Sequence, residues 1–182
     1  MFNLFQFISS NGGSRNAATG PNYTNYWFSI SPDLLKEALP RLAAFFSGPL
    51  FTPSVTSREI NAVDSENKKN LQNDSRRLWH LQNNLGILGH PWTKFSTGNI
   101  ESLTETARRL EKEGKLPPAE DVEGDGGPVG RETRRRLIEW WKGTYCASRM
   151  TLAVVGKGEA ASPLYSYERV FEEKKLQNLS TS

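Results

Sequence analysis

The chain opens with a short helical pattern that ends at Asn11-Gly12-Gly13 and continues into a predicted β-hairpin. Ser14–Thr19 is short and mixed in character, whereas Tyr23–Ser31 alternates and is rich in aromatic and β-branched residues. Gly20-Pro21-Asn22 between them is typical of a turn. Alternation places three apolar residues of the second strand on one face, which are Tyr26, Phe28 and Ile30.

A helical pattern follows the hairpin and begins at Ser31-Pro32-Asp33, which supplies an N-cap, a first-turn proline and an acid at the positive end. Pro40 lies inside this helix, where an interior proline costs about 3 kcal/mol and favours a kink. Gly48-Pro49 ends it. Its apolar stripe consists of Leu35, Ala38, Leu42, Phe45 and Phe46.

The longest polar pattern without a breaker is Thr56–Arg77, and we expect one helix to continue from it to Gly86. Thr56 and Glu59 have the spacing of a capping box. Glu59 and Glu66 are seven residues apart, which places both carboxylates on nearly the same helix face. Burying them would be costly unless water, a basic partner or a metal compensated their charge.

The second half of the chain predicts two more helices and a last strand. One helix opens at Ser102 and ends near Gly114, and the other covers Arg131–Gly143. Residues 115–130 between them are rich in proline, glycine and acids, which predicts a flexible insertion. Arg149–Val155 is apolar enough for a core strand. The fold class is therefore α+β, an antiparallel sheet with helices packed on one face.

Composition narrows the partners and the compartment. The 182 residues are 36% hydrophobic and carry a net charge of +3, which disfavours nucleic acid as a partner. Arg134, Arg135 and Arg136 beside two tryptophans suit an amphipathic framework helix better than a nucleic-acid site, because Glu132 and Glu139 can pair with Arg135.

No apolar run is long enough for a membrane span, and the start of the chain predicts no signal peptide. The single cysteine, Cys146, excludes an internal disulfide and favours a reducing compartment. We expect the cytoplasm, with the mitochondrion as the alternative.

The run REINAVDSENKKNLQND, which begins at Arg58, resembles the insulin-degrading enzyme family of zinc peptidases, also called pitrilysin-type or inverzincin. The resemblance spans about Leu4 to Lys157 and includes similarity to the a-factor-processing proteases. It implies a bound zinc ion, with Glu66 as its carboxylate ligand and Glu59 as the partner that positions Glu66. It also implies that Ser14–Thr19 is an edge strand that binds peptide substrate through Asn16 and Ala17. Ala18 departs from the family, which has an aromatic residue there.

The same family holds its zinc with the two histidines of an HxxEH helix, whose glutamate is the general base. This sequence contains only His80 and His90, neither in that motif, and we expect neither to be a ligand. By the resemblance, Met1 falls inside the family's domain and the HxxEH helix is expected upstream of it. Residues 1–157 are then a partial metallopeptidase N-terminal domain, and 158–182 a divergent tail.

Two functions remain open from the sequence. In the first, the chain is a fragment of a zinc metalloendopeptidase that cleaves small peptides with zinc-activated water, and it is inactive alone because the HxxEH residues are absent. In the second, it is a non-catalytic structural or substrate-binding homologue of the same clan. The expected partners are peptide substrates, together with the remaining domains of the family's enzymes or another subunit. We expect neither nucleic acid nor a membrane.

Overall fold

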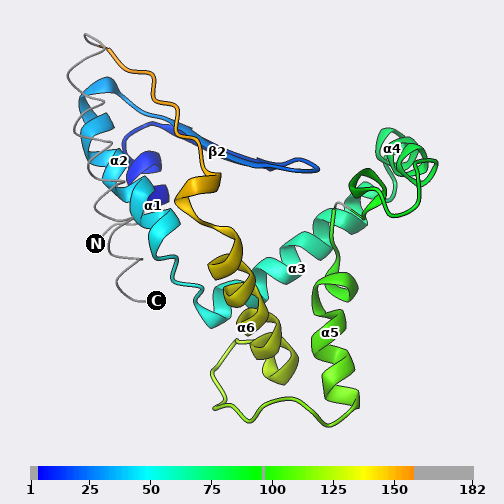
Figure 1. Ribbon diagram of the computed structural model, residues 1–182. Helices are drawn as coiled ribbons and strands as arrows, with labels where there is room; N and C mark the ends of the chain where they lie inside the picture. Colours follow the sequence, from blue (N-terminus) through cyan, green and yellow to red (C-terminus); the bar gives the residue numbers. More distant parts are fainter. Residues whose placement is uncertain (1–3, 96, 158–182) are drawn as a thin grey trace. The chain divides into compact units, whose positions relative to one another are not determined.

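The computed structural model describes residues 4–95 and 97–157, and the predicted tail at 158–182 lies outside them. The chain divides into two compact units (Figure 1). Unit 1 comprises Met1–Leu50 and Tyr145–Ser182, and unit 2 comprises Phe51–Thr144. The described residues form six α-helices and a two-stranded antiparallel sheet, so the α+β class is confirmed.

Unit 1 packs two helices against one face of the predicted hairpin. Its elements are α1 (Leu4–Ser10), β1 (Ser14–Thr19), β2 (Thr24–Ser29) and α2 (Pro32–Ser47). Ser14 pairs with Ser29 and Thr19 with Thr24, which gives the alternation expected for β2. The buried core consists of Leu4, Ile8, Leu39 and Leu42, with Phe28 and Ile30 packed against it.

Helix α2 continues through Pro40 without ending. The proline ring is exposed, while Leu39 and Leu42 of the same helix stay buried in the core. Burial of this apolar face outweighs the helix hydrogen bond that Pro40 cannot make. Gly48 follows the last turn, as the sequence predicts.

Aromatic side chains join β2 to α2 and to the segment after residue 144. The Tyr26 ring lies 5.4 Å from the Phe45 ring and 5.2 Å from the Phe46 ring, both edge to face. Its hydroxyl hydrogen-bonds the Tyr145 hydroxyl at 2.9 Å. Burial, together with this hydrogen bond, raises the pKa of Tyr26.

The strand predicted at Arg149–Val155 is wrong. Ala147–Arg149 forms a short 3-10 helix, η2, and the residues after it up to 157 have no regular structure. Val154 packs against the core of unit 1, whereas Val155 is 96% exposed. An apolar pattern makes a strand only where a neighbouring strand offers hydrogen bonds, and in the part of the chain that the structure describes β1 and β2 pair only with each other.

Unit 2 is helical. Its elements are α3 (Pro53–Asn70), α4 (Asp74–Asn84), the 3-10 helix η1 (Pro91–Thr93), α5 (Ile100–Lys112) and α6 (Gly127–Thr144). Helices α5 and α6 pack together, and α3 contacts both (Figure 1).

The single helix predicted from Thr56 to Gly86 is also wrong, because it is divided into α3 and α4. Helix α3 begins three residues earlier, at Pro53, so Thr56 lies inside its first turns, and the capping box with Glu59 does not form. Instead, the Thr56 hydroxyl donates to the Thr52 carbonyl at 3.3 Å. At the break, the Asn73 side chain accepts a hydrogen bond from the Arg76 N–H at 3.1 Å and starts α4 as its N-cap.

Helices α5 and α6 both begin before the predicted residues. Asn99 caps α5 in a reciprocal capping box with Ser102, and Gly114 follows its end in the left-handed conformation. Helix α6 already starts at Gly127, inside the stretch predicted to be flexible. Asp125 orders this start by accepting hydrogen bonds from the N–H groups of Gly127 and Val122. Flexibility of residues 115–130 stays a prediction.

Candidate functional site

Strand β1 is an edge of its sheet, because among the described residues it pairs only with β2. The Gly20 N–H donates to the Tyr23 carbonyl at 2.8 Å and closes the hairpin. Antiparallel pairs alternate between those that exchange hydrogen bonds and those that do not. Because Gly20 and Tyr23 form a hydrogen-bonded pair, the alternation makes Ala17 and Tyr26 a pair without mutual hydrogen bonds. The N–H and carbonyl of Ala17 therefore point to the open edge.

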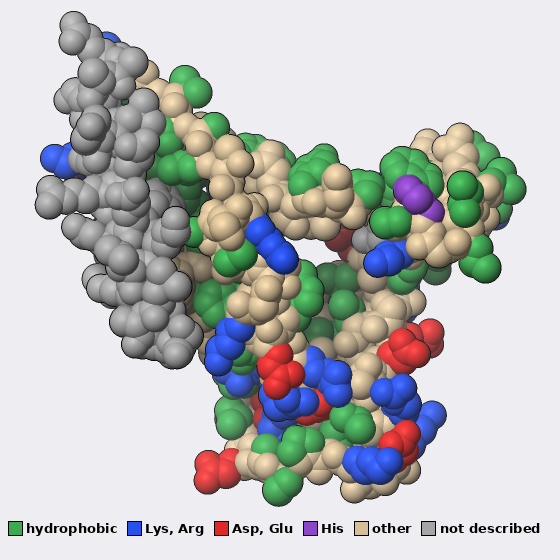
Figure 2. Space-filling model, viewed as in Figure 1, with side chains coloured by type: hydrophobic (Ala, Val, Ile, Leu, Met, Phe, Trp, Pro, Cys, Tyr) green, Lys and Arg blue, Asp and Glu red, His purple; other side chains and the backbone are tan. Residues whose placement is uncertain are grey.

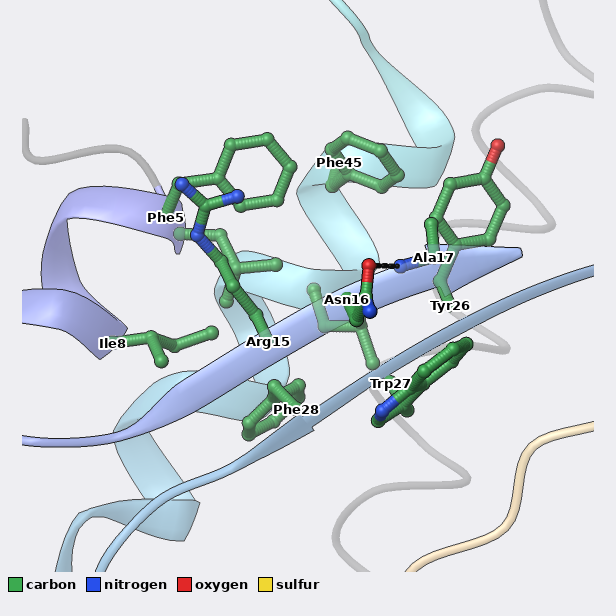
Figure 3. A pocket seen from close by; sticks show the side chains of 11 residues that line it. Phe5, Ile8, Arg15, Asn16, Ala17, Tyr26, Trp27, Phe28 and Phe45 are labelled. Atoms are coloured by element: carbon green, nitrogen blue, oxygen red, sulfur yellow. Dashed lines mark hydrogen bonds between the residues drawn. The ribbon is translucent and has the colours of Figure 1, made fainter. Parts of the chain in front are cut away.

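The predicted substrate contacts, Asn16 and Ala17, both lie on this edge and are exposed. The Asn16 side-chain oxygen accepts a hydrogen bond from the Ala17 N–H at 2.9 Å (Figure 3). The amide therefore occupies the place where the carbonyl of an added strand would bind. The sequence identified the edge, but this local contact depends on the Asn16 rotamer and has no sequence signal.

A cavity of about 270 Å³ lies beside β1, between the hairpin and the two helices of unit 1 (Figure 3). Its walls are almost entirely apolar or aromatic. Arg15 is at its rim, with the guanidinium carbon 4.0 Å from the centre of the Phe5 ring. The other lining residues are Leu4, Ile8, Asn16, Ala17, Tyr26, Trp27, Phe28, Leu42 and Phe45.

The two predicted zinc-site carboxylates, Glu59 and Glu66, are in unit 2 and both are exposed on α3. Seven residues of helix separate them by about 10 Å along the axis and leave them on nearly the same face. Within the described residues, neither carboxylate has an ion-pair partner.

The opposite face of α3 holds buried polar residues, which the sequence analysis did not single out. Asp64 accepts a hydrogen bond from the Ile100 N–H at 3.0 Å and pairs with Lys68 at 2.7 Å. The hydrogen bond from Lys68 lowers the pKa of the Asp64 carboxyl. Asp64 thereby joins α3 to the N-terminus of α5 and fixes the face on which Glu59 and Glu66 are exposed.

The two histidines have structural contacts. His80 is half-buried in α4, and its ring lies 5.2 Å from the Trp79 ring and 6.1 Å from the Phe95 ring. His90 caps η1, with its Nδ1 accepting a hydrogen bond from the Trp92 N–H at 3.2 Å. Residues 4–95 and 97–157 contain no group of three His, Cys, Asp or Glu side chains placed to hold a metal. These residues therefore do not complete a zinc centre, although Glu66 is a suitable single ligand.

The arginines of α6 are engaged with carboxylates and backbone. Arg135 and Arg136 both donate to Glu132, which is buried, and Arg135 also pairs with Glu139. Arg134 donates to the carbonyl of Phe51. The pairing predicted for Arg135 is confirmed.

The sequence of this chain matches a known family. Residues 2–87 match the family model described as Insulinase (Peptidase family M16). The chain belongs to this family of zinc peptidases, of the insulin-degrading type.

Several relatives are similar over most of this chain. It is 42% identical over 151 residues to the A-factor-processing enzyme of Saccharomyces cerevisiae, and 40% identical over 151 residues to the insulin-degrading enzyme of Drosophila melanogaster. Each alignment covers 83% of this chain and 13% of the relative. Insulin-degrading enzyme-like 1, peroxisomal, of Arabidopsis thaliana is 39% identical over 173 residues, which cover 95% of this chain and 16% of the relative.

The chain thus spans about a sixth or less of the length of these relatives. None of the helices in the described ranges is both long and apolar enough to cross a membrane.

Proposed function

We propose that this chain carries the peptide-binding edge and the acidic helix of an insulin-degrading-type zinc endopeptidase that acts on small peptides. The observation that carries the proposal is the open edge of β1, with Asn16 and Ala17 exposed on it. Glu66 is the proposed carboxylate ligand of zinc, and Glu59 the residue that positions it. The imidazole ligands and the base would come from polypeptide outside this sequence.

By itself, the chain is proposed to bind an extended peptide without cleaving it. A peptide that adds to β1 as a strand replaces the Asn16 amide at the Ala17 N–H and gains the outward carbonyl as well. Each such backbone hydrogen bond contributes about 0.5–1.5 kcal/mol net. Ala18 has only a methyl group, so binding depends on the backbone more than on side chains.

The binding test uses an unstructured peptide of about eight residues and the backbone amide signals of the ¹⁵N-labelled chain. We expect the largest shifts at Ala17 and Thr19, whose N–H groups point outward. Ala17→Pro removes one of these donors while keeping the hairpin, because a proline is tolerated where an edge N–H faces solvent. It should weaken binding several-fold, as expected for the loss of one such hydrogen bond. Asn25→Ala, on the neighbouring strand, is the matched control and should bind normally. Equal binding by Ala17→Pro would exclude strand addition.

A hydrolysis test addresses the missing ligands. Incubated with a fluorogenic peptide and added zinc, the chain should give no turnover above buffer, with or without a chelator, because the described residues supply no imidazole ligands beside Glu66. Chelator-sensitive turnover that Glu66→Gln abolishes would overturn this prediction.

The contacts of His80 and His90 favour a second candidate function. His80 packs against an aromatic ring and His90 caps η1, so neither histidine acts as a ligand beside Glu66. In this alternative the protein is a non-catalytic structural or substrate-binding homologue that works with another subunit. The coding sequence upstream of the Met1 codon discriminates the two. An in-frame HxxEH motif supports the peptidase, and its absence there supports the non-catalytic homologue.

For the compartment we propose the cytoplasm, with the mitochondrion as the alternative. The single cysteine, Cys146, is exposed, and its hydrogen bond with Ser148 lowers the pKa of the thiol, so a reducing environment suits it. One relative is named as peroxisomal. Imaging of the tagged gene product with markers for the three compartments tests the proposal, and accumulation in peroxisomes would contradict it.

A further inference from the structure

The cavity beside β1 combines an apolar lining with one positive charge. Among the described residues that line it, Arg15 alone carries a charge. Its volume of about 270 Å³ is just below the range of about 300–1,000 Å³ typical of small-molecule sites. The cavity therefore suits one apolar group the size of an amino-acid side chain.

Among the described residues, no carboxylate pairs with the Arg15 guanidinium, which is held over an aromatic ring. It lies over the Phe5 ring at 4.0 Å, and Figure 3 shows the two side chains together at the rim of the cavity. None of the ion pairs within residues 4–95 and 97–157 includes Arg15. A guanidinium binds a carboxylate through two parallel hydrogen bonds, so the charge at this rim is complementary to a carboxylate ligand.

The register of β1 brings this cation next to the proposed peptide edge. Arg15 pairs with Phe28 and Ala17 with Tyr26, so their side chains share the face that looks into the cavity. A peptide that ends at this point has a carboxylate for Arg15. The side chain of its last residue lies within reach of Phe28, Leu42 and Phe45.

We propose that this cavity binds the C-terminal residue of a peptide, with its apolar side chain inside and its α-carboxylate on Arg15. The inference deepens the proposed function and rests on it, since it names the class of peptide that the β1 edge prefers: short peptides with a free carboxylate on a terminal leucine or phenylalanine.

The test compares two tetrapeptides that end in phenylalanine, one with a free carboxylate and one with a C-terminal amide, titrated calorimetrically into the full chain. Charge-assisted hydrogen bonds predict that the free acid binds about 10-fold tighter or more. Arg15→Gln should bring this ratio to about one. Arg15→Lys keeps the charge but cannot make the two parallel hydrogen bonds of a guanidinium, so it should leave an intermediate ratio. Arg41→Gln is the matched control, because Arg41 also stacks on a phenylalanine of unit 1, Phe7, but does not line the cavity. It should keep the wild-type ratio.

The outcomes separate this inference from the proposed function. If both peptides bind equally well and Ala17→Pro weakens the binding of both, strand addition at β1 is supported and the assignment of the cavity to a terminal carboxylate is wrong. If Arg15→Gln is folded by circular dichroism but keeps the wild-type ratio, Arg15 is not the carboxylate partner. If neither tetrapeptide binds but N-acetylphenylalanine binds and Arg15→Gln weakens it, strand addition is contradicted and the carboxylate site at Arg15 is supported. If octanoate binds more tightly than N-acetylphenylalanine, the proposal that the cavity binds a peptide C-terminus is wrong.

Discussion

For Glu132 in α6, the sequence predicts the arginine partners of the side chain but not its burial. Its side chain is 1% exposed. It accepts from Arg135 at 2.7 Å and from Arg136 at 2.8 Å. These hydrogen bonds, that of Arg135 first, lower the pKa of Glu132. Helical spacing indicates such pairs, whereas only the packing of α6 removes the carboxylate from water.

We predict that Glu132→Gln destabilises the chain by about 2–3 kcal/mol. Breaking a fully buried pair costs about 3–5 kcal/mol, and here the two guanidiniums, 47% and 44% exposed, can turn to water. Glu139→Gln is the matched control, because Glu139 pairs with Arg135 at the surface with its side chain 61% exposed. It should cost less than about 1 kcal/mol. Urea unfolding measures both, and equal losses would contradict the burial argument.

At the scale of elements, α4 is short, polar on one face and apolar on the other, and the apolar face is exposed. Figure 2 shows hydrophobic side chains gathered over α4 and the loop after it. Leu78, Leu81 and Leu85 are 62, 60 and 87% exposed, and Leu88 is 97% exposed. An exposed apolar patch of this kind favours association.

We predict that the chain self-associates through this face and that the double variant Leu81→Lys/Leu85→Lys is less associated. Both side chains are already exposed, so the free energy of unfolding should change by less than about 0.5 kcal/mol. Light scattering over a concentration series measures association, and a thermal melt checks the fold. Thr106→Lys, a polar position on α5, is the control. Unchanged association in the double variant would assign self-association to another surface, such as the open edge of β1.

For the whole molecule, the two units depend on different interactions. Unit 1 has an apolar core, from Leu4 to Leu42. In unit 2, buried polar residues take a large share, with Asp64, Asp125 and Glu132 all joined to basic groups or backbone N–H groups. Among the described residues, the carboxyls with a clearly lowered pKa are these three, all in unit 2. At Asp125 burial is the largest single influence and raises the pKa, but the hydrogen bonds from Arg131, Gly127 and Val122 and the charge of Arg131 together outweigh it.

Acid should therefore weaken unit 2 before unit 1. A carboxyl whose pKa is lowered on folding adds stability above its unfolded pKa of about 4, and this stability is lost as the pH falls through the folded value. Of the five tryptophans, only Trp27 is in unit 1. Trp27→Phe thus lets fluorescence report unit 2 alone, and a chain that keeps only Trp27 reports unit 1. We expect the unit 2 signal to change at the higher pH, below about pH 4. Coincident transitions would contradict separate responses.

The sequence by itself determined the elements whose signals are local. Alternation and a Gly-Pro-Asn turn are enough for the hairpin, and caps, glycines and apolar stripes are enough for the existence of α2, α5 and α6. It also indicated the β1 edge with Asn16 and Ala17, because an edge position follows from the hairpin and the family resemblance. The roles of Glu59 and Glu66 stay predictions.

Only the tertiary structure decided what depends on distant neighbours. The apolar segment at Arg149–Val155 lacks a strand to pair with among the described residues, so it is no strand. The break between α3 and α4 is different, because the cap at Asn73 is a local contact; its signal competes with a continuous helical pattern in a run that has no glycine or proline, and the pattern alone did not reveal it. The burial of Asp64 and the position of Arg15 at the cavity both arise where elements meet. Periodicity fixes which face of an element a residue is on, but it does not fix what covers that face.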